Sequence, residues 1–336
     1  MRLKTCILAV SFVSMSAAAG AQTVAEFYKG RNLSLLVGSD IGGGYDVYSR
    51  TLARHWGRHI PGNPSIVVQN MPGANGVTMM NHLVNAAPRD GSVVGATFGA
   101  DLTEPLIDQG KYTKYDPREV AWIGNIAPQY NTCFVGKNSK IKTLDDAMKH
   151  ETLVAAGGAN SNAAVTANVY NTLIGTKFKP ILGYSSNALI LAIERGETDG
   201  TCLSYDTLIA SQPDAVARGA FNWLIVLNDK PIAELPGTPA ATQFARTEEE
   251  RQSLELLIAR NLMGRPFAAA KQVPADRLEA LRTSFFETLK DPAYLEEAKA
   301  QKMTVSPADH VAMEKMIAGV YKIPSHIVQR IIDLTK

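Results

Sequence analysis

The sequence lacks several features that mark common classes of protein. Its 336 residues include only three cysteines, and no two are spaced as C-x-x-C, so neither zinc binding nor thioredoxin chemistry is expected. Beyond the N-terminus, no stretch is apolar for long enough to cross a membrane. The 34 lysines and arginines nearly balance the 32 aspartates and glutamates. The basic surface that a nucleic-acid partner requires is therefore not expected.

The chain also lacks the signatures of common catalytic sites. It contains no G-x-S-x-G, no H-E-x-x-H and no acidic metal cluster. His55 and His59 are four residues apart on one predicted helix, but no third ligand is near, and we interpret the pair as part of a solvent-facing helix surface. No nucleophile can be paired with a base. These absences argue against an enzyme, against a bound metal and against any other cofactor.

The N-terminus is typical of a secretory signal peptide. Arg2 and Lys4 precede an apolar run over residues 7–13, and small residues then lead to Ala19-Gly20-Ala21. The apolar run is too short to span a bilayer. Cys6 lies ahead of the run, too early to be a lipoprotein anchor. We predict cleavage near Ala21 and export of a soluble protein.

Export bears on the two cysteines that remain, Cys133 and Cys202. An oxidising compartment permits a disulfide, and each cysteine lies in a strand-like run. If the two strands are neighbours, the cysteines can bridge; otherwise both are buried free thiols. The sequence leaves both possibilities open.

One stretch organises the first part of the chain. Leu33–Val37 is an apolar run typical of a buried strand, Gly42, Gly43 and Gly44 permit a sharp turn, and a helix starts near Asp46. A helix N-terminus presents free N–H donors and a partial positive charge. The turn matches neither the dinucleotide fingerprint nor the P-loop. It is therefore either a site for another anion, such as a carboxylate, or a plain connection.

The same unit occurs a second time. The predicted strand Thr152–Ala156 runs into Gly157 and Gly158, and a helix follows Ser161. Around both units strands and helices alternate, which predicts parallel sheets covered by helices. The two turns look equivalent in two similar halves. Facing each other across a cleft, they would present two helix N-termini to one small anion.

Capping residues predict where further helices begin. Thr143 with Asp146 three residues later fits a capping box. Asp291-Pro292 and Ser306-Pro307 each place a capping side chain before a proline at the first helical position.

Six short motifs carry a resemblance to one family. They are Gly42–Asp46, Asn70–Gly76, Ala86–Gly91, Tyr115–Pro117, Arg195–Gly200 and Leu235–Pro239. In order and spacing they resemble the periplasmic solute-binding receptors of tripartite tricarboxylate transporters, often called Bug proteins, from near residue 27 to near residue 330. The motifs are specific as a series rather than singly.

The resemblance implies a type II periplasmic-binding-protein fold. In this α/β fold, two α/β lobes surround a ligand cleft and are joined by two crossing strands. The implied parts are the signal peptide 1–21, lobe 1 from 22–127 plus 228–336, and lobe 2 from 128–227, with crossings near 123–132 and 223–228.

The resemblance also implies a function. Such a protein, a monomer in the periplasm, captures a small organic acid (a carboxylate) and delivers it to a two-subunit membrane permease. Two alternatives are a periplasmic sensor that feeds a signalling receptor and, from another class, an exported hydrolase.

The candidate ligand-binding residues come from the two turns and one later loop. They are Gly42, Gly43, Gly44, Tyr45, Asp46, Gly158, Asn160, Ser161, Asn162, Tyr184, Ser185 and Ser186. Asp46 either accepts from the ligand or a bridging water or caps its helix, and Ser161 and Asn162 likewise either donate to a carboxylate or cap. The end of the third strand, 97–101, is a further candidate, because α/β sheets bind ligands there.

The second turn departs from the family pattern. Ala163 and Ala164 stand where the family has a histidine, and Gly183–Ser186 stands where it has Pro-Tyr-Lys-Gly. At the first turn, Ile41 replaces a proline. The changes in the second turn fall on the contacts to a second carboxylate and argue against a plain four-carbon dicarboxylate.

Overall fold

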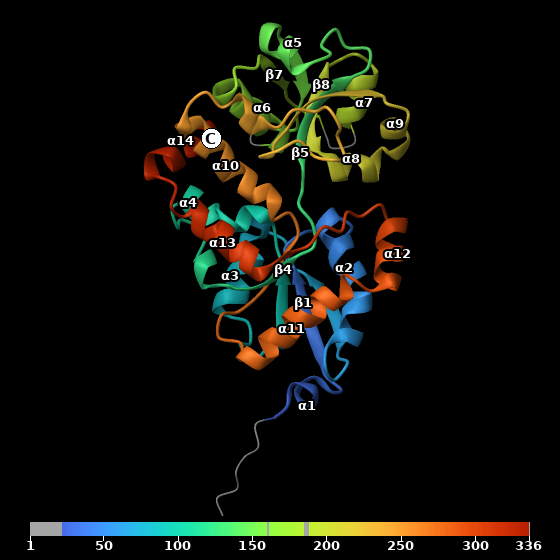
Figure 1. Cartoon of the computed structure of the whole chain (residues 1–336), viewed down its shortest axis with the longest axis vertical. Coiled ribbons are helices and arrows are strands. Elements are labelled where there is room, and N and C mark those ends of the chain that lie inside the picture. The colour runs from blue at the N-terminus through green and yellow to red at the C-terminus, as the bar shows by residue number, and fades with distance from the viewer. Residues whose placement is uncertain (1–21, 160, 185–187, 336) are drawn as a thin grey trace, which may run out of the picture.

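The computed structural model describes residues 22–159, 161–184 and 188–335. Two mixed sheets organise these residues into two lobes, which lie one above the other in Figure 1. The first sheet has the order β11-β4-β10-β3-β1-β2 and the second the order β7-β6-β8-β5-β9. The strands of the first sheet are β1 Asn32–Val37, β2 Ser65–Asn70, β3 Val93–Ala96, β4 Ala121–Asn125, β10 Pro266–Ala269 and β11 Ala308–Asp309. Those of the second are β5 Asn131–Gly136, β6 Thr152–Ala155, β7 Phe178–Ile181, β8 Gly200–Ser204 and β9 Phe221–Val226.

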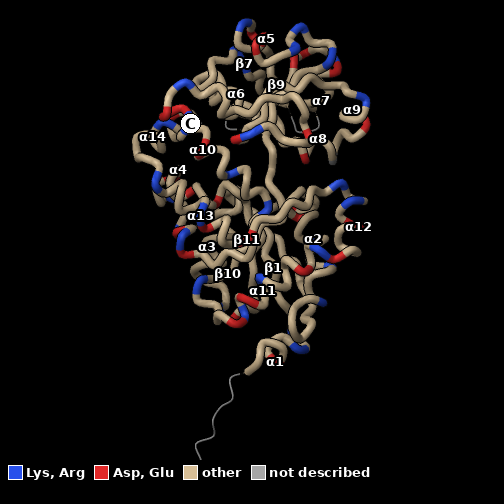
Figure 2. Tube along the Cα trace, in the orientation of Figure 1, with Lys and Arg blue, Asp and Glu red and all other residues tan. Residues whose placement is uncertain are grey.

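Helices cover both sheets. They are α1 Val24–Tyr28, α2 Gly44–Trp56, α3 Val77–Asn85, α4 Glu104–Ile107, α5 Leu144–Lys149, α6 Asn162–Leu173, α7 Ala188–Glu194, α8 Tyr205–Ser211, α9 Pro213–Ala217, α10 Glu248–Leu262, α11 Ala275–Thr288, α12 Pro292–Ala300, α13 His310–Val320 and α14 Ser325–Thr335. Within the described residues, none of these helices combines the length and apolar character needed to cross a bilayer. Charges of both signs are interspersed over both lobes (Figure 2).

The two sheets repeat one arrangement. β1 lies between parallel neighbours β2 and β3, and β6 lies between parallel neighbours β7 and β8. In both lobes the strand leads through a glycine turn into the next long helix, α2 or α6. The predicted strand–turn–helix units therefore occupy equivalent positions.

The chain passes between the sheets through residues 126–130, which join β4 to β5, and returns through α10, which leads to β10. The sequence analysis assigned all of 228–336 to lobe 1. In the structure, apolar residues of α10 and α14, such as Leu254 and Ile331, are buried in one core with those of α6, such as Leu173. This range therefore contributes to both lobes, because α14 packs directly on α6 of the second lobe and α10 packs on α14.

The second sheet joins the two cysteines. β5 and β8 are antiparallel neighbours in which Cys133 lies directly opposite Cys202. The two residues form a disulfide, with Cα atoms 4.0 Å apart, and both are fully buried. Of the two possibilities that the sequence left open, the structure shows the bridge.

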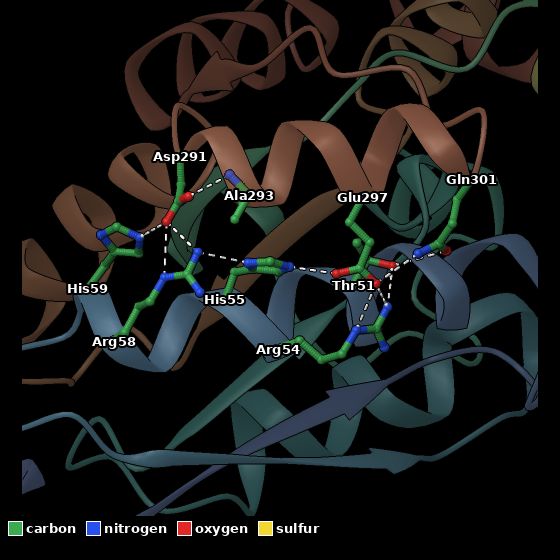
Figure 3. A network of polar contacts seen from close by, with 9 residues as sticks. All are labelled: Thr51, Arg54, His55, Arg58, His59, Asp291, Ala293, Glu297 and Gln301. Carbon is green, nitrogen blue, oxygen red and sulfur yellow. Dashed lines mark hydrogen bonds and ion pairs between the residues drawn. The ribbon is translucent and has the colours of Figure 1, made fainter.

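Helix α2 is held in place by an ion-pair network with α12 (Figure 3). Arg54 and His55 both contact Glu297, the latter at 2.6 Å. Arg58 and His59 both contact Asp291, the latter at 2.8 Å. Because His55 Nδ1 accepts from Arg58 at 2.8 Å, its Nε2–H is the donor to Glu297. The interpretation of these histidines as a solvent-facing surface is wrong, since His55 is buried against α12 and His59, in the 3-10 turn that follows α2, is partly buried and paired with Asp291.

The helix caps are only partly as predicted. Thr143 and Asp146 form a capping box at α5, and Asp291 caps α12 by accepting from the Ala293 N–H. The start predicted at Ser306-Pro307 is wrong. Short strand β11 occupies 308–309, and Asp309 caps α13 instead. Pairing of β11 with β4 takes precedence there over the local capping signal.

Loss of the disulfide is expected to destabilise the fold. The bridge closes a loop of 69 residues, and the loop-entropy model assigns such a closure up to about 4 kcal/mol. Cys133→Ala/Cys202→Ala should therefore unfold at lower denaturant than the wild type. Adding a reductant should shift the wild type toward the variant and leave the variant unchanged. Coincident unfolding curves for the two proteins would contradict this assignment.

The α2–α12 network predicts a pH dependence. Hydrogen bonds, first from Arg58 and then from His59, hold the pKa of Asp291 below its ordinary value. Such a carboxylate stabilises the fold above its ordinary pKa of about 4, and this contribution is lost as the pH falls below that value. Asp291→Asn should thus lower the melting temperature at pH 7. This gap in melting temperature between wild type and variant should narrow below about pH 4. Asp145→Asn, in an exposed pair with Lys149, is the matched control and should show no gap.

Candidate functional site

A cavity of about 530 Å³ lies between the lobes. Its walls come from the start of α2, the 3-10 turn Gly99–Leu102, α4, the lobe-connecting segments, α10 and the flank of α6. The lining residues are Tyr45, Asn75, Phe98, Gly99, Ala100, Glu104, Ile107, Gln129, Asn131, Asn162, Val165, Thr166, Val169, Tyr170, Leu227, Leu257, Arg260 and Asn261. Of the predicted ligand residues, Tyr45 and Asn162 line it, one from each helix start.

The first glycine turn is shaped by Asp46. Its carboxylate accepts from the Gly42 N–H, from Arg50 and from Asn70, each at 2.9 Å, and only 2% of Asp46 is exposed. Burial alone would raise the pKa of Asp46, but these donors outweigh that effect and hold it below its ordinary value. Gly43, not Asp46, is the N-cap of α2. Asp46 therefore fixes the exposed turn, and a contact with ligand stays a prediction.

Beneath Tyr45 lies a buried guanidinium that the sequence analysis missed. Arg265, directly before β10, is 5% exposed and stacks on the rings of Tyr45 and Tyr48, at 4.3 and 4.8 Å from their centroids. One terminal nitrogen donates to Gln129 Oε1 at 3.1 Å, and the Tyr45 hydroxyl donates to the same oxygen. The other, Nη2, lies 3.6 Å from where a Cβ on Gly44 would stand. The guanidinium is thus packed against the first turn of α2.

Arg265 carries a charge that is only partly compensated, by its electrostatic interaction with the carboxyl of the half-buried Asp206. Its Nε has no hydrogen-bond partner, and no carboxylate of the described residues comes within ion-pair distance of it. A buried charge is normally paired, because removing it from water is costly. The first-turn N–H groups of α2, which have no intrahelical acceptors, add to the positive potential. This corner of the site is therefore suited to an anion.

The second turn is capped and open. Ser161 is the N-cap of α6, where its hydroxyl accepts from the Ala164 N–H at 3.4 Å, and Gly158 is exposed. Tyr184 lies away from the cavity, with its hydroxyl donating to Glu197 at 3.3 Å. The predicted contacts Asn160, Ser185 and Ser186 lie outside the described residues.

The 3-10 turn that contributes Phe98, Gly99 and Ala100 is held by Asp101. This carboxylate is fully buried and accepts from Thr97, from the Phe98 N–H and from Tyr115. Burial raises the pKa of Asp101 to about 7, against the effect of these donors.

Two glycines make the close packing of this turn possible. A Cβ on Gly76, which has a φ of +97°, would lie 2.4 Å from Asp101 Oδ2, and one on Gly99 would lie 1.9 Å from the Arg260 carbonyl oxygen. Gly76 ends one of the motifs that carry the family resemblance. Its role there is to let the turn pack closely.

The charged side chains that line the cavity neutralise each other. Glu104 and Arg260 form an ion pair at 3.7 Å, and burial raises the pKa of Glu104. Across the described residues, no group of three or more histidine, cysteine, aspartate or glutamate side chains could hold a metal ion. What the cavity offers instead is amides, hydroxyls and apolar surface.

Two α/β lobes that enclose a cavity of this kind define the fold class of periplasmic solute-binding proteins. The chain belongs to the tripartite tricarboxylate transporter family of receptors (TctC), whose family model matches residues 50–332. This confirms the family predicted from the motifs. Proteins of this family are periplasmic receptors.

Solved structures support the fold assignment. A TctC solute-binding protein from Polaromonas is 20% identical, with a TM-score of 0.69 over 90% of this chain and 99% of that chain. The malate-bound MatC of Rhodopseudomonas palustris is 14% identical, with a TM-score of 0.60 over 91% and 99%. A second protein of that organism, with adipate, is 16% identical, with a TM-score of 0.61 over 90% and 98%. No curated protein matches the chain.

Asp101 predicts a second pH dependence, of opposite sign to that of Asp291. Its pKa in the folded protein, about 7, lies above its ordinary value, so between about pH 4 and 7 the folded form keeps a proton that the unfolded form loses. Stability from this group therefore falls as the pH rises through that window. Asp101→Asn, a neutral mimic, should become more stable relative to the wild type from pH 5 to 8, as measured by denaturant unfolding. A difference in unfolding free energy between variant and wild type that stays constant with pH would contradict this prediction. Asp116→Asn, at an exposed ion pair, is the control.

Proposed function

We propose that this protein captures a small organic carboxylate between its lobes and delivers it to a membrane permease of two subunits. It does so in the periplasm as a monomer, after cleavage of the signal peptide near Ala21, and it has no catalytic activity. The observation that carries the proposal is Arg265, a buried guanidinium at the start of α2 with no carboxylate of the described residues within ion-pair distance.

The carboxylate is placed at this guanidinium and at the first-turn N–H groups that follow Gly43. Exposed glycines there leave the backbone open to approach. A planar guanidinium recognises a carboxylate with two parallel hydrogen bonds. The family and the organic acids in two structural relatives, malate and adipate, agree with this chemistry.

The body of the ligand extends over Tyr45 into the cavity. Tyr45 belongs both to the carboxylate position and to the cavity wall. Its ring stacks on Arg265 and also lines the cavity beside Phe98. Asn162 and the start of α6 meet the ligand from the second lobe. The remaining proposed contacts are Gly42, Gly43, Gly44, Asp46, Gly158, Asn160, Ser161, Ser185 and Ser186, whereas Tyr184 lies away from the cavity.

Calorimetry and thermal shift with monocarboxylates and dicarboxylates of three to six carbons test this function. An acid at a hundred times its Kd should stabilise the wild type by about 2.7 kcal/mol. Arg265→Gln should weaken binding at least tenfold, because the charge that pairs with the carboxylate is lost. Arg118→Gln, at an exposed arginine paired with Asp116, should bind normally.

Two results would refute the proposal. One is the absence of stabilisation by every organic acid tested. The other is unchanged affinity in a folded Arg265→Gln variant, with folding checked by circular dichroism.

A further inference from the structure

Two asparagines in the cavity wall bond to each other. Asn131, at the start of β5, donates from Nδ2 to Oδ1 of Asn261, near the end of α10, at 3.1 Å. The Gln129 N–H donates to the Asn261 carbonyl oxygen at 2.7 Å, which fixes the two segments side by side. Both asparagines line the cavity and are 8% exposed.

One side of this amide pair makes no hydrogen bond with the described residues, and we call it the unused edge. Asn131 Oδ1 and Asn261 Nδ2 have no hydrogen-bond partner among the described residues. The same holds for the hydroxyl of Tyr170, a fully buried residue of α6 that also lines the cavity. Buried polar atoms in native proteins are nearly always paired, because an unpaired one is destabilising. Three such atoms around one cavity indicate a polar group that belongs there.

The chemistry of the unused edge does not depend on how the amides are oriented. If oxygen and nitrogen are exchanged in both side chains, the bond between them persists with the roles reversed. In either arrangement the pair leaves one donor and one acceptor. A carboxylate supplies acceptors only, whereas a carboxamide supplies one donor group and one acceptor.

Charge gives a second reason to exclude a carboxylate here. Arg260, which lines the same cavity, is already paired with Glu104 and is therefore not free to neutralise a second carboxylate. The guanidinium of Arg265, which forms no ion pair among the described residues, lies behind Tyr45 and can pair with one carboxylate. The rest of the wall includes apolar side chains of α6 and α10, such as Val165, Val169 and Leu257.

We infer that the ligand is a monocarboxylate whose far end is an uncharged carboxamide, bound by Asn131 and Asn261. The inference rests on the proposed function and names the chemical class of the ligand. The carboxylate binds at Arg265, the amide meets the asparagine pair and the Tyr170 hydroxyl, and an apolar body spans the space between them.

Matched trios of acids test this inference by titration calorimetry. The first is adipate, its monoamide and its monomethyl ester; the second is benzene-1,4-dicarboxylate with the same two derivatives. Within a trio the monoamide should bind at least tenfold more tightly than the diacid and the ester. The ester is uncharged at that end but has no donor, so it separates loss of charge from hydrogen bonding.

The variants assign the preference to the asparagine pair. Asn131→Leu/Asn261→Leu keeps the side-chain size and should reduce the preference for the monoamide over the ester to about threefold or less. Asn168→Leu, on the exposed face of α6, should keep the full preference. Tyr170→Phe should weaken monoamide binding more than ester binding.

The outcomes separate the two proposals. If the diacid or the ester binds as well as the monoamide, or if the Asn131/Asn261 variant keeps the preference, the inference is wrong while the proposed function stands. If neither trio nor any other organic acid tested binds the wild type, the carboxylate function fails and the inference fails with it.

Discussion

The binding region depends on one interaction, the stacking of the Arg265 guanidinium on two tyrosines of α2. This stacking holds a buried positive charge at the start of the helix, where no carboxylate of the described residues lies within ion-pair distance. Tyr45 can hold that position only because α2 itself is fixed. The turn before it is braced by Asp46, and its far end is held by the ion pairs with Asp291 and Glu297. The charge is thus prepared for an anion by contacts far outside the cavity.

The rest of the fold adds a second wall to the cavity, and its chemistry differs from that of the charged site. The repeated strand–turn–helix unit places the starts of α2 and α6 on one cavity, through Tyr45 and Asn162. The lobe-connecting segment and α10 add the amide pair Asn131–Asn261. The region therefore combines a positive potential at Arg265 with neutral hydrogen-bonding groups at the amide pair, and the proposed preference for ligands with a single charged end depends on this difference.

Much of the fold was predictable because its signals are local. Glycines after apolar runs marked both turns, and the motif series, now supported by the family match, gave the two-lobed α/β class. The structural predictions were wrong where contacts between residues far apart in the sequence determine the structure. Pairing of β11 with β4 replaced the helix start predicted at Ser306, and α14 packed on the second lobe. His55, which is buried, and His59, which is partly buried, proved to be partners of a helix that lies more than two hundred residues later in the chain.

The sequence by itself determined most of the elements and the family, since propensities, caps and the individual motifs all act over a few residues. Tertiary structure alone decided that Cys133 faces Cys202, that Arg265 lies beneath Tyr45, and that Asn131 meets Asn261. Each of these pairs is separated by many residues, and no pattern around either partner encodes the other. Burial, which makes an unpaired charge or amide costly and hence informative, exists only once the chain has folded.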